Sequence, residues 1–165
     1  MMDSLRTLGV GALLAGLLLA GCAVPQWQKP GTPLAQIEQG MGQPTRSVAL
    51  PDGGQRLIYS YQPSGQQVWQ MQFDAAQRLV SATQVLTVEQ FQKLRPGVDT
   101  RASVLDTFGP PALVEGVASF EGDVWTYRIL ENNIPRLASV HIDPRGIVQR
   151  VVFTDEIRAD ADPKR

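Results

Sequence analysis

The sequence has little of what disulfides, metal centres and nucleic-acid binding require. Its 165 residues include one cysteine and one histidine, so an intramolecular disulfide is excluded and zinc lacks a ligand set. The formal net charge is -1, and charged residues make up 19% of the chain. Nucleic-acid binding needs a basic face, so this balance argues against nucleic acid as a partner. No metal or other cofactor is expected.

The sequence also lacks an apolar run of about 20 residues, the length that crosses a bilayer as a helix. Residues 8–20 form a shorter uncharged run behind Arg6, which is typical of a signal-peptide core. The run ends in Leu-Ala-Gly-Cys at positions 19–22, which resembles the lipobox of bacterial lipoproteins. We therefore expect a lipoprotein signal peptide over residues 1–21, lipidation of Cys22, and a lipidated tether over residues 22–31.

Two residues of this tether bear on where the chain is anchored. Ala23 follows the cysteine; in lipoproteins of this type an aspartate there favours the inner membrane, so the resemblance implies the periplasmic face of the outer membrane. Trp27 has two interpretations. Its indole suits lipid headgroups, or it folds back on the following domain, and the second interpretation is preferred.

Two stretches of the remaining chain resemble each other, residues 32–44 and residues 100–111. Each begins with a threonine, Thr32 or Thr100, whose hydroxyl can cap a helix N-terminus. Apolar residues then recur on one helical face, and a glycine follows, Gly42 or Gly109, with a proline close behind. This ending is a helix C-terminal signature, so each stretch predicts a short helix.

Strand patterns follow each predicted helix in the same order. They lie at 57–61, 69–74 and 79–86 in the first copy, and at 123–127, 138–143 and 147–153 in the second. A capping-box pattern at Thr87 opens a further short helix that ends near Leu94. We therefore predict an α+β fold of two tandem units, residues 32–86 and 87–157, each a short helix followed by a three-stranded antiparallel meander. Residues 158–165 are predicted to form a flexible tail.

The two units resemble the SmpA/OmlA family of outer-membrane lipoproteins, the BamE type. The second unit carries the family pattern at Gly97, Thr100, Val104, Gly109, Pro111, Trp125, Tyr127, Ile142, Asp143, Gly146 and Val148. The first unit keeps it at Thr32, Gly42, Pro44, Tyr59, Tyr61, Phe73 and Asp74, but has Gln77 in place of the turn glycine. The resemblance implies a BamE-like fold and an outer-membrane protein complex as the partner. The tandem arrangement is also similar, in fold alone, to secreted β-lactamase inhibitor proteins.

Three residues of one predicted strand, Ser139, His141 and Asp143, suggest a catalytic triad because strand alternation puts them on one face. Residues two apart on a strand lie about 6.5–7 Å apart, however, and hydrogen bonding needs about 3 Å. No catalytic residue is therefore predicted, and His141 is expected to be a solvated strand residue. The acidic residues near the C-terminus lack EF-hand spacing and are expected to form a solvated tail: Asp155, Glu156, Asp160 and Asp162.

The predicted function is that of a non-catalytic, membrane-anchored protein-binding module in outer-membrane protein assembly or envelope integrity. The alternative is an inhibitor or ligand-binding protein on the same tandem fold. That alternative needs a concave sheet with exposed aromatic side chains, whereas aromatic residues spaced two apart are expected in the core. Whether Tyr59, Tyr61, Trp69 and Trp125 are exposed or buried therefore discriminates between the two functions. An envelope hydrolase is a third hypothesis, for which the sequence supplies no nucleophile paired with a base.

Overall fold

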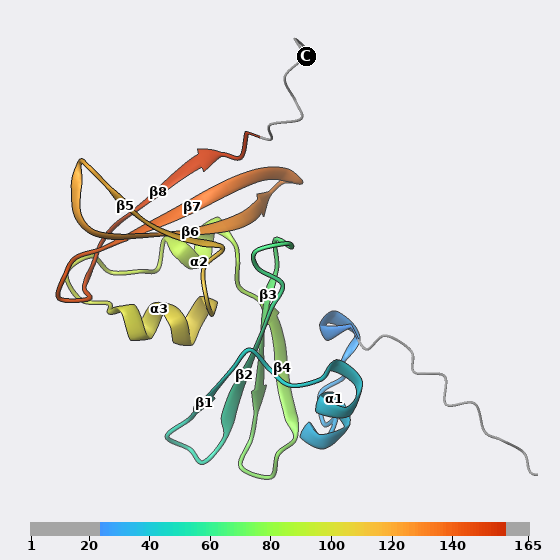
Figure 1. Cartoon of the computed structure of the whole chain (residues 1–165). Coiled ribbons are helices and arrows are strands. Elements are labelled where there is room, and N and C mark those ends of the chain that lie inside the picture. Colours follow the sequence, from blue (N-terminus) through green and yellow to red (C-terminus); the bar gives the residue numbers. More distant parts are fainter. Residues whose placement is uncertain (1–23, 158–165) are drawn as a thin grey trace, which may run out of the picture.

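The computed structural model describes residues 24–157, which form two four-stranded antiparallel sheets and a few short helices (Figure 1). The first sheet has the strand order β1-β2-β3-β4 and consists of β1 (Arg46–Ala49), β2 (Gln55–Ser60), β3 (Val68–Phe73) and β4 (Leu79–Gln84). The second has the order β5-β6-β7-β8 and consists of β5 (Leu113–Val117), β6 (Phe120–Glu131), β7 (Ile134–Ile142) and β8 (Val148–Asp155). The helical elements are the 3-10 turn η1 (Pro25–Trp27) and the helices α1 (Leu34–Met41), α2 (Val88–Phe91) and α3 (Arg101–Phe108).

The predicted fold class, an α+β fold of two helix-plus-three-strand units, is wrong, because the fold is mostly β. Each sheet has a fourth strand, β1 or β5, which pairs with the first predicted strand of that sheet. The sequences of these strands, Arg-Ser-Val-Ala and Leu-Val-Glu-Gly-Val, do not alternate between apolar and polar residues as a half-buried strand does. Their pairing with a neighbouring strand, and not a local pattern, therefore makes them strands. The other six strands lie close to their predicted positions.

The start of one predicted helix is confirmed and the start of the other is not. At α3 the Ser103 N–H donates to the Thr100 hydroxyl at 3.2 Å, and the Thr100 N–H donates to the Ser103 hydroxyl at 2.9 Å. This reciprocal pair is a capping box. Thr32 does not cap α1, because Pro33 takes the capping position and the Thr32 hydroxyl donates to the Lys29 carbonyl at 2.7 Å.

Equivalent hydrogen bonds recur in the two halves of the chain. The Tyr59 hydroxyl donates to the Gly42 carbonyl at 3.1 Å, and the Tyr127 hydroxyl donates to the Gly109 carbonyl at 2.8 Å. Both glycines follow a helix and have positive φ, the conformation that favours glycine. The turn before the last strand of each sheet also matches, although Gln77 adopts a φ of 58° where the second half has glycine. Strand β2 is therefore equivalent to β6, and β3 to β7.

Apolar side chains form two cores, one of which belongs to both sheets. The smaller core packs α1 against one face of the first sheet and contains Ile37, Leu57, Tyr59, Met71, Phe73 and Leu79. The larger core joins Ile58, Val68, Val85 and Leu86 of the first half to Phe91, Val104, Phe108, Trp125, Tyr127, Ile129, Ala138, Val140, Ile142 and Val148. At its centre the rings of Phe91 and Phe108 stack with centroids 4.0 Å apart. The two halves therefore depend on each other for burial of their apolar surface.

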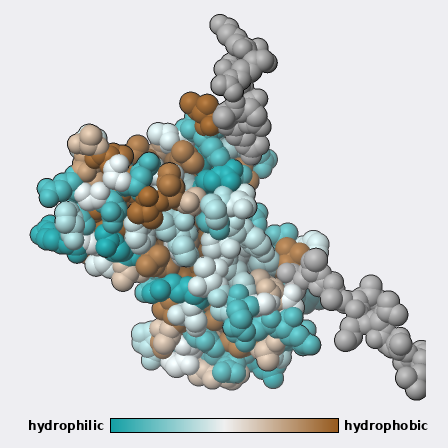
Figure 2. Space-filling view, in the orientation of Figure 1, coloured by the Kyte–Doolittle hydropathy of each residue, from teal (hydrophilic) through white to brown (hydrophobic). Residues whose placement is uncertain are grey.

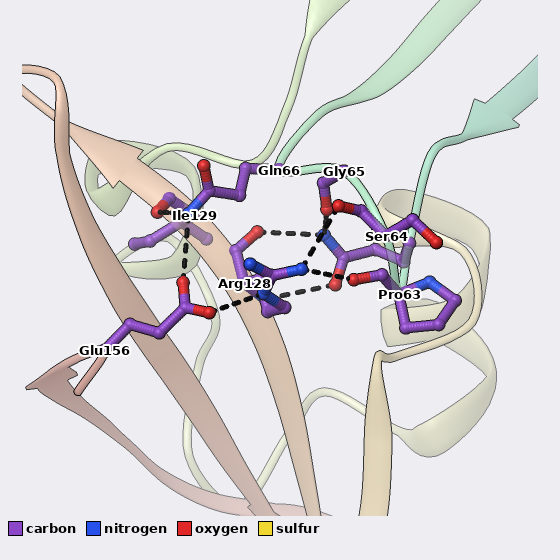
Figure 3. A network of polar contacts seen from close by, with 8 residues as sticks. Pro63, Ser64, Gly65, Gln66, Arg128, Ile129 and Glu156 are labelled. Atoms are coloured by element: carbon purple, nitrogen blue, oxygen red, sulfur yellow. Dashed lines mark hydrogen bonds and ion pairs between the residues drawn. The ribbon is translucent and has the colours of Figure 1, made fainter. Parts of the chain in front are cut away.

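A polar network ties the loop between β2 and β3 to the second sheet (Figure 3). The Gln62 amide donates to the Arg128 carbonyl at 2.9 Å and accepts from the Arg128 N–H at 3.0 Å. The Arg128 guanidinium in turn donates to the carbonyls of Pro63 at 2.7 Å and Ser64 at 3.1 Å. It also pairs with the Glu156 carboxylate at 2.7 Å. These bonds fix the loop, and with it the first sheet, against β6.

The chain before α1 also packs on the first sheet. Pro25 of η1 is buried, and η1 contacts β4. The Gly31 N–H then donates to the Leu79 carbonyl at 2.7 Å. This segment therefore folds back on the domain, while the Trp27 side chain itself remains 72% exposed.

The predicted signal peptide over residues 1–21, the lipidation site Cys22 and the predicted tail over residues 158–165 lie outside the described residues. Within residues 24–157, no helix has the length and apolar character needed to cross a membrane.

We expect the free energy of unfolding to fall above about pH 10, because two phenols are buried. Burial and, to a lesser extent, the charge of Glu38 raise the pKa of Tyr59 to about 12, and burial also raises the pKa of Tyr127. A tyrosine in the unfolded chain titrates near pH 10. Above that pH the unfolded chain loses these protons more readily than the folded chain, so the free energy of unfolding falls as the pH rises toward the folded pKa. Urea unfolding on both sides of that pH measures the effect.

The Tyr127→Phe substitution should lower the free energy of unfolding by about 1 kcal/mol at neutral pH and make its pH dependence shallower. Equal dependence in the variant and the wild type would contradict this assignment.

Candidate functional site

The structure places Ser139, His141 and Asp143 on one stretch of β7 and the turn after it, and each makes its own contacts. The His141 Nδ1 atom lies 3.4 Å from the backbone carbonyl oxygen of Ser139, and the Ser139 hydroxyl contacts the Thr126 hydroxyl at 3.2 Å. The Asp143 carboxylate binds the Arg145 guanidinium at 2.9 Å and the backbone of its own turn. These contacts are structural, and they lack the pairing of nucleophile and base that catalysis requires.

His141 is buried, with 7% exposure, so the expectation of a solvated strand residue is wrong. The Phe120 ring lies edge-on against the imidazole, with centroids 5.0 Å apart, and covers it. Burial and, to a lesser extent, the charge of Arg150 lower the pKa of His141 below its usual value. The imidazole is therefore neutral at pH 7.

The acidic residues near the C-terminus do not all form a solvated tail as predicted. Glu156 is largely buried in its ion pair with Arg128, whereas the Asp155 side chain is 80% exposed. Asp160 and Asp162 lie outside the described residues. Across residues 24–157, no three His, Cys, Asp or Glu side chains come together as the ligands of a metal ion would.

The four aromatic residues that decide between protein binding and ligand binding are mostly packed. Tyr59 and Trp125 are buried, and Trp69 packs partly buried against the smaller core. Tyr61 is the exception, with 47% exposure. Of these four residues, Tyr61 alone is exposed enough to belong to a ligand-binding aromatic patch.

A cavity of about 470 Å³ opens beside Tyr61, between the β2–β3 loop and the end of β6. Its amide groups are already in use. The Gln66 amide donates to the Glu156 carboxylate at 3.0 Å, and the Gln67 amide oxygen accepts from the Trp69 indole at 3.2 Å. A ligand in this cavity has to compete with those bonds, so the cavity is the weaker candidate site.

The edge strand β5 is the stronger candidate site. It pairs with β6 alone, and four of its five residues are exposed. Leu113 and Val114 are each 51% exposed, and Glu115 is the one charge in the strand. Proteins usually protect sheet edges with charges, prolines or covering elements, because a bare edge pairs with other chains. The opposite edge, β8, has Arg150 and Asp155 at exposed positions, but β5 has less protection.

Strand β5 borders a face of the second sheet that no helix covers within residues 24–157 (Figure 1). We call it the open face and define it by the side chains of Leu113, Val124, Thr126, Ser139, His141, Arg150 and Val152. Strand alternation puts them opposite the core residues of β6 and β7. One row across the four strands pairs Leu113 with Thr126, Thr126 with Ser139, and Ser139 with Val152. Figure 2 shows apolar patches at the upper left, where Figure 1 places β5 and β6.

The first sheet shows how an equivalent face is covered. Its β2 and β3 strands carry Ile58 and Gln70 on the face toward α3, and Ile58 is fully buried there. The Gln70 amide donates to the Thr107 carbonyl of α3 at 2.7 Å, and Arg46 of β1 donates to the Asp106 carboxylate of α3 at 2.6 Å. The described part of the second sheet has no counterpart of α3. On its open face Val124, Thr126 and His141 are buried, whereas Leu113, Ser139, Arg150 and Val152 are at least partly exposed and can contact another molecule.

The chain has little similarity to known proteins. A scan against protein-family models gives no match, and neither does a search of curated proteins. Among solved structures the chain is similar to a DUF4309 family protein (YjgB) from Bacillus subtilis subsp. subtilis str. 168, with 15% sequence identity and a TM-score of 0.32. That match covers 76% of this chain and 79% of the other. A TM-score this low carries no argument about fold or function.

Proposed function

We propose that the chain is a membrane-anchored periplasmic lipoprotein that binds a protein partner and catalyses no reaction. Its anchor is the lipid predicted on Cys22. Its partner is an outer-membrane protein complex, as the resemblance to SmpA/OmlA lipoproteins implies, and its role is in outer-membrane protein assembly or envelope integrity. The observation that carries the proposal is the exposed, weakly protected strand β5 beside the open face.

Binding at β5 adds a strand of the partner to the second sheet. In this mode an extended segment pairs its backbone with the free edge, and side-chain contacts give specificity. Leu113 and Val152 supply partly exposed apolar contacts at the two ends of one row of the open face. Because His141 is neutral, the charges at this face are those of Arg150 and of Glu115, which pairs with Val124.

Capture of partners from crosslinked membranes tests the proposal. The wild-type protein should recover a component of the outer-membrane protein-assembly machinery. The Leu113→Lys variant puts a charge at the edge of the open face. Loss of an interface anchor costs about 1–2 kcal/mol or more, so we expect this variant to recover roughly tenfold less partner.

The matched control is Val98→Lys, because Val98 is 57% exposed and lies before α3, outside β5 and the open face. It should capture as much partner as the wild type. Circular dichroism and urea unfolding of both variants show whether they fold. Capture of nothing but abundant lipoproteins by the wild type, or equal capture by both lysine variants, would refute the proposal.

The cavity beside Tyr61 favours the alternative, an inhibitor or ligand-binding protein. The same capture experiment separates the two functions. If the chain is an inhibitor of another protein, Tyr61→Ala abolishes capture and Leu113→Lys leaves it unchanged; if it binds a small ligand, the wild type captures no assembly protein. Under the proposal, Leu113→Lys reduces capture of the partner and Tyr61→Ala leaves it unchanged.

A further inference from the structure

The side chain of Trp27 is the most exposed aromatic side chain of the described residues, at 72%. It belongs to neither hydrophobic core. Tryptophan is enriched at membrane–water interfaces, because its indole has an apolar body and a polar N–H. An exposed indole in a segment this close to the predicted lipid therefore calls for an explanation.

The backbone that carries Trp27 is held against the domain. Its N–H donates to the Val24 carbonyl at 3.0 Å, and the Gln28 N–H donates to the Pro25 carbonyl at 3.2 Å. Pro25 is buried, and the Gly31 N–H donates to β4 at 2.7 Å. The position of the indole relative to the first sheet is therefore set by the fold.

We infer that Trp27 inserts into the headgroup region of the bilayer that holds the Cys22 lipid and thereby orients the domain. The inference rests on the proposed lipidation. Trp27 lies five positions after Cys22, so the chain from one to the other spans at most about 18 Å when fully extended. The indole therefore stays within reach of the membrane surface. Lys29, two positions later in the chain, is also exposed, and its positive charge is attracted to anionic headgroups.

This contact has a consequence for the open face. In Figure 1, η1 and α1 (blue) lie beside the first sheet, and the second sheet lies on the other side of that sheet. With Trp27 in the headgroups, the first sheet faces the bilayer. The open face and β5 then point into the periplasm, where a partner can reach them.

Quenching of tryptophan fluorescence by brominated lipids tests the inference. The full chain is expressed in a Gram-negative host, its mass is measured, and the membrane product is reconstituted in phosphatidylethanolamine–phosphatidylglycerol vesicles with and without brominated acyl chains. We expect the brominated vesicles to quench part of the emission. Trp27→Phe should lose that quenching, and Trp69→Phe, which removes a partly packed indole, should retain it.

The outcomes separate the inference from the proposed function. The inference is overturned if the brominated lipids do not quench the acylated wild-type protein, or if they quench the Trp27→Phe variant as strongly as the wild type. Either result leaves the lipoprotein proposal standing. A product without acyl mass overturns both.

Discussion

The Phe108→Ala variant should lose about 3–5 kcal/mol of its free energy of unfolding. Phe108 is fully buried and stacks on Phe91 with ring centroids 4.0 Å apart. A domain of this size is stable by about 5–15 kcal/mol in total, so the variant should be marginally folded. Because Ile58, Val68 and Val85 of the first half share this core, both sheets should lose stability together.

Urea unfolding followed by circular dichroism and tryptophan fluorescence measures this loss. Trp69 reports on the first sheet and Trp125 on the second, so both signals should shift in one common transition. The control is Ile157→Ala, since Ile157 is 90% exposed and should change stability by less than about 0.5 kcal/mol. Two separate transitions, or a loss below about 1 kcal/mol, would show that the halves do not depend on a common core.

Cys22→Ser should move nearly all of the protein from the membrane fraction to the soluble periplasmic fraction. The thiol of Cys22 is the predicted acyl acceptor, and the sequence holds no second cysteine to replace it. Each buried methylene of an acyl chain contributes about 0.8 kcal/mol, so several chains hold a protein firmly whereas one chain binds marginally. Loss of the lipid should therefore remove the attachment almost completely.

Cell fractionation and intact mass spectrometry check this second result. The control is Trp27→Phe, which should keep the acyl mass and stay in the membrane fraction, because its expected effect is on orientation. Membrane retention of Cys22→Ser, or an unmodified mass for the wild type, would contradict lipidation at Cys22.

Features of the fold that depend on neighbouring residues could be predicted from the sequence. The Thr100 cap and the Gly109 end of α3 follow from signals within a few residues, and the structure confirms both. The capping hydroxyl at Thr87 is confirmed in the same way, by its contact with the Gln90 N–H at 3.3 Å. Strands with clear alternation were also found close to their predicted positions.

Features that depend on residues far apart in the sequence could not be predicted. His141 is buried because Phe120, from the start of β6, covers its ring. Glu156 is paired because β8 brings it to Arg128, a residue 28 positions earlier. No local pattern at His141 or Glu156 indicates either contact.

The candidate site was missed because β5 was missed. Its sequence does not alternate between apolar and polar residues. Within its sheet, β5 is held by pairing with β6 alone. The repeat offered a weak signal, since β1 and β5 both lie between a helix-ending glycine and the first strand pattern of their half. The open face could not be predicted from the sequence. It is recognised only by comparison of the two sheets, since α3 covers the equivalent face of the first sheet and no described helix covers this one.

Photo-crosslinking in intact cells tests most directly whether β5 binds a protein partner. A photoreactive residue is placed at position 113, on β5, or at position 98, which is comparably exposed in the wild type. Position 113 should give a discrete crosslink to an outer-membrane assembly protein, and position 98 should give none. A crosslink of equal strength from both positions, or no crosslink from position 113 in a lipidated and folded protein, would contradict the assignment of the binding surface.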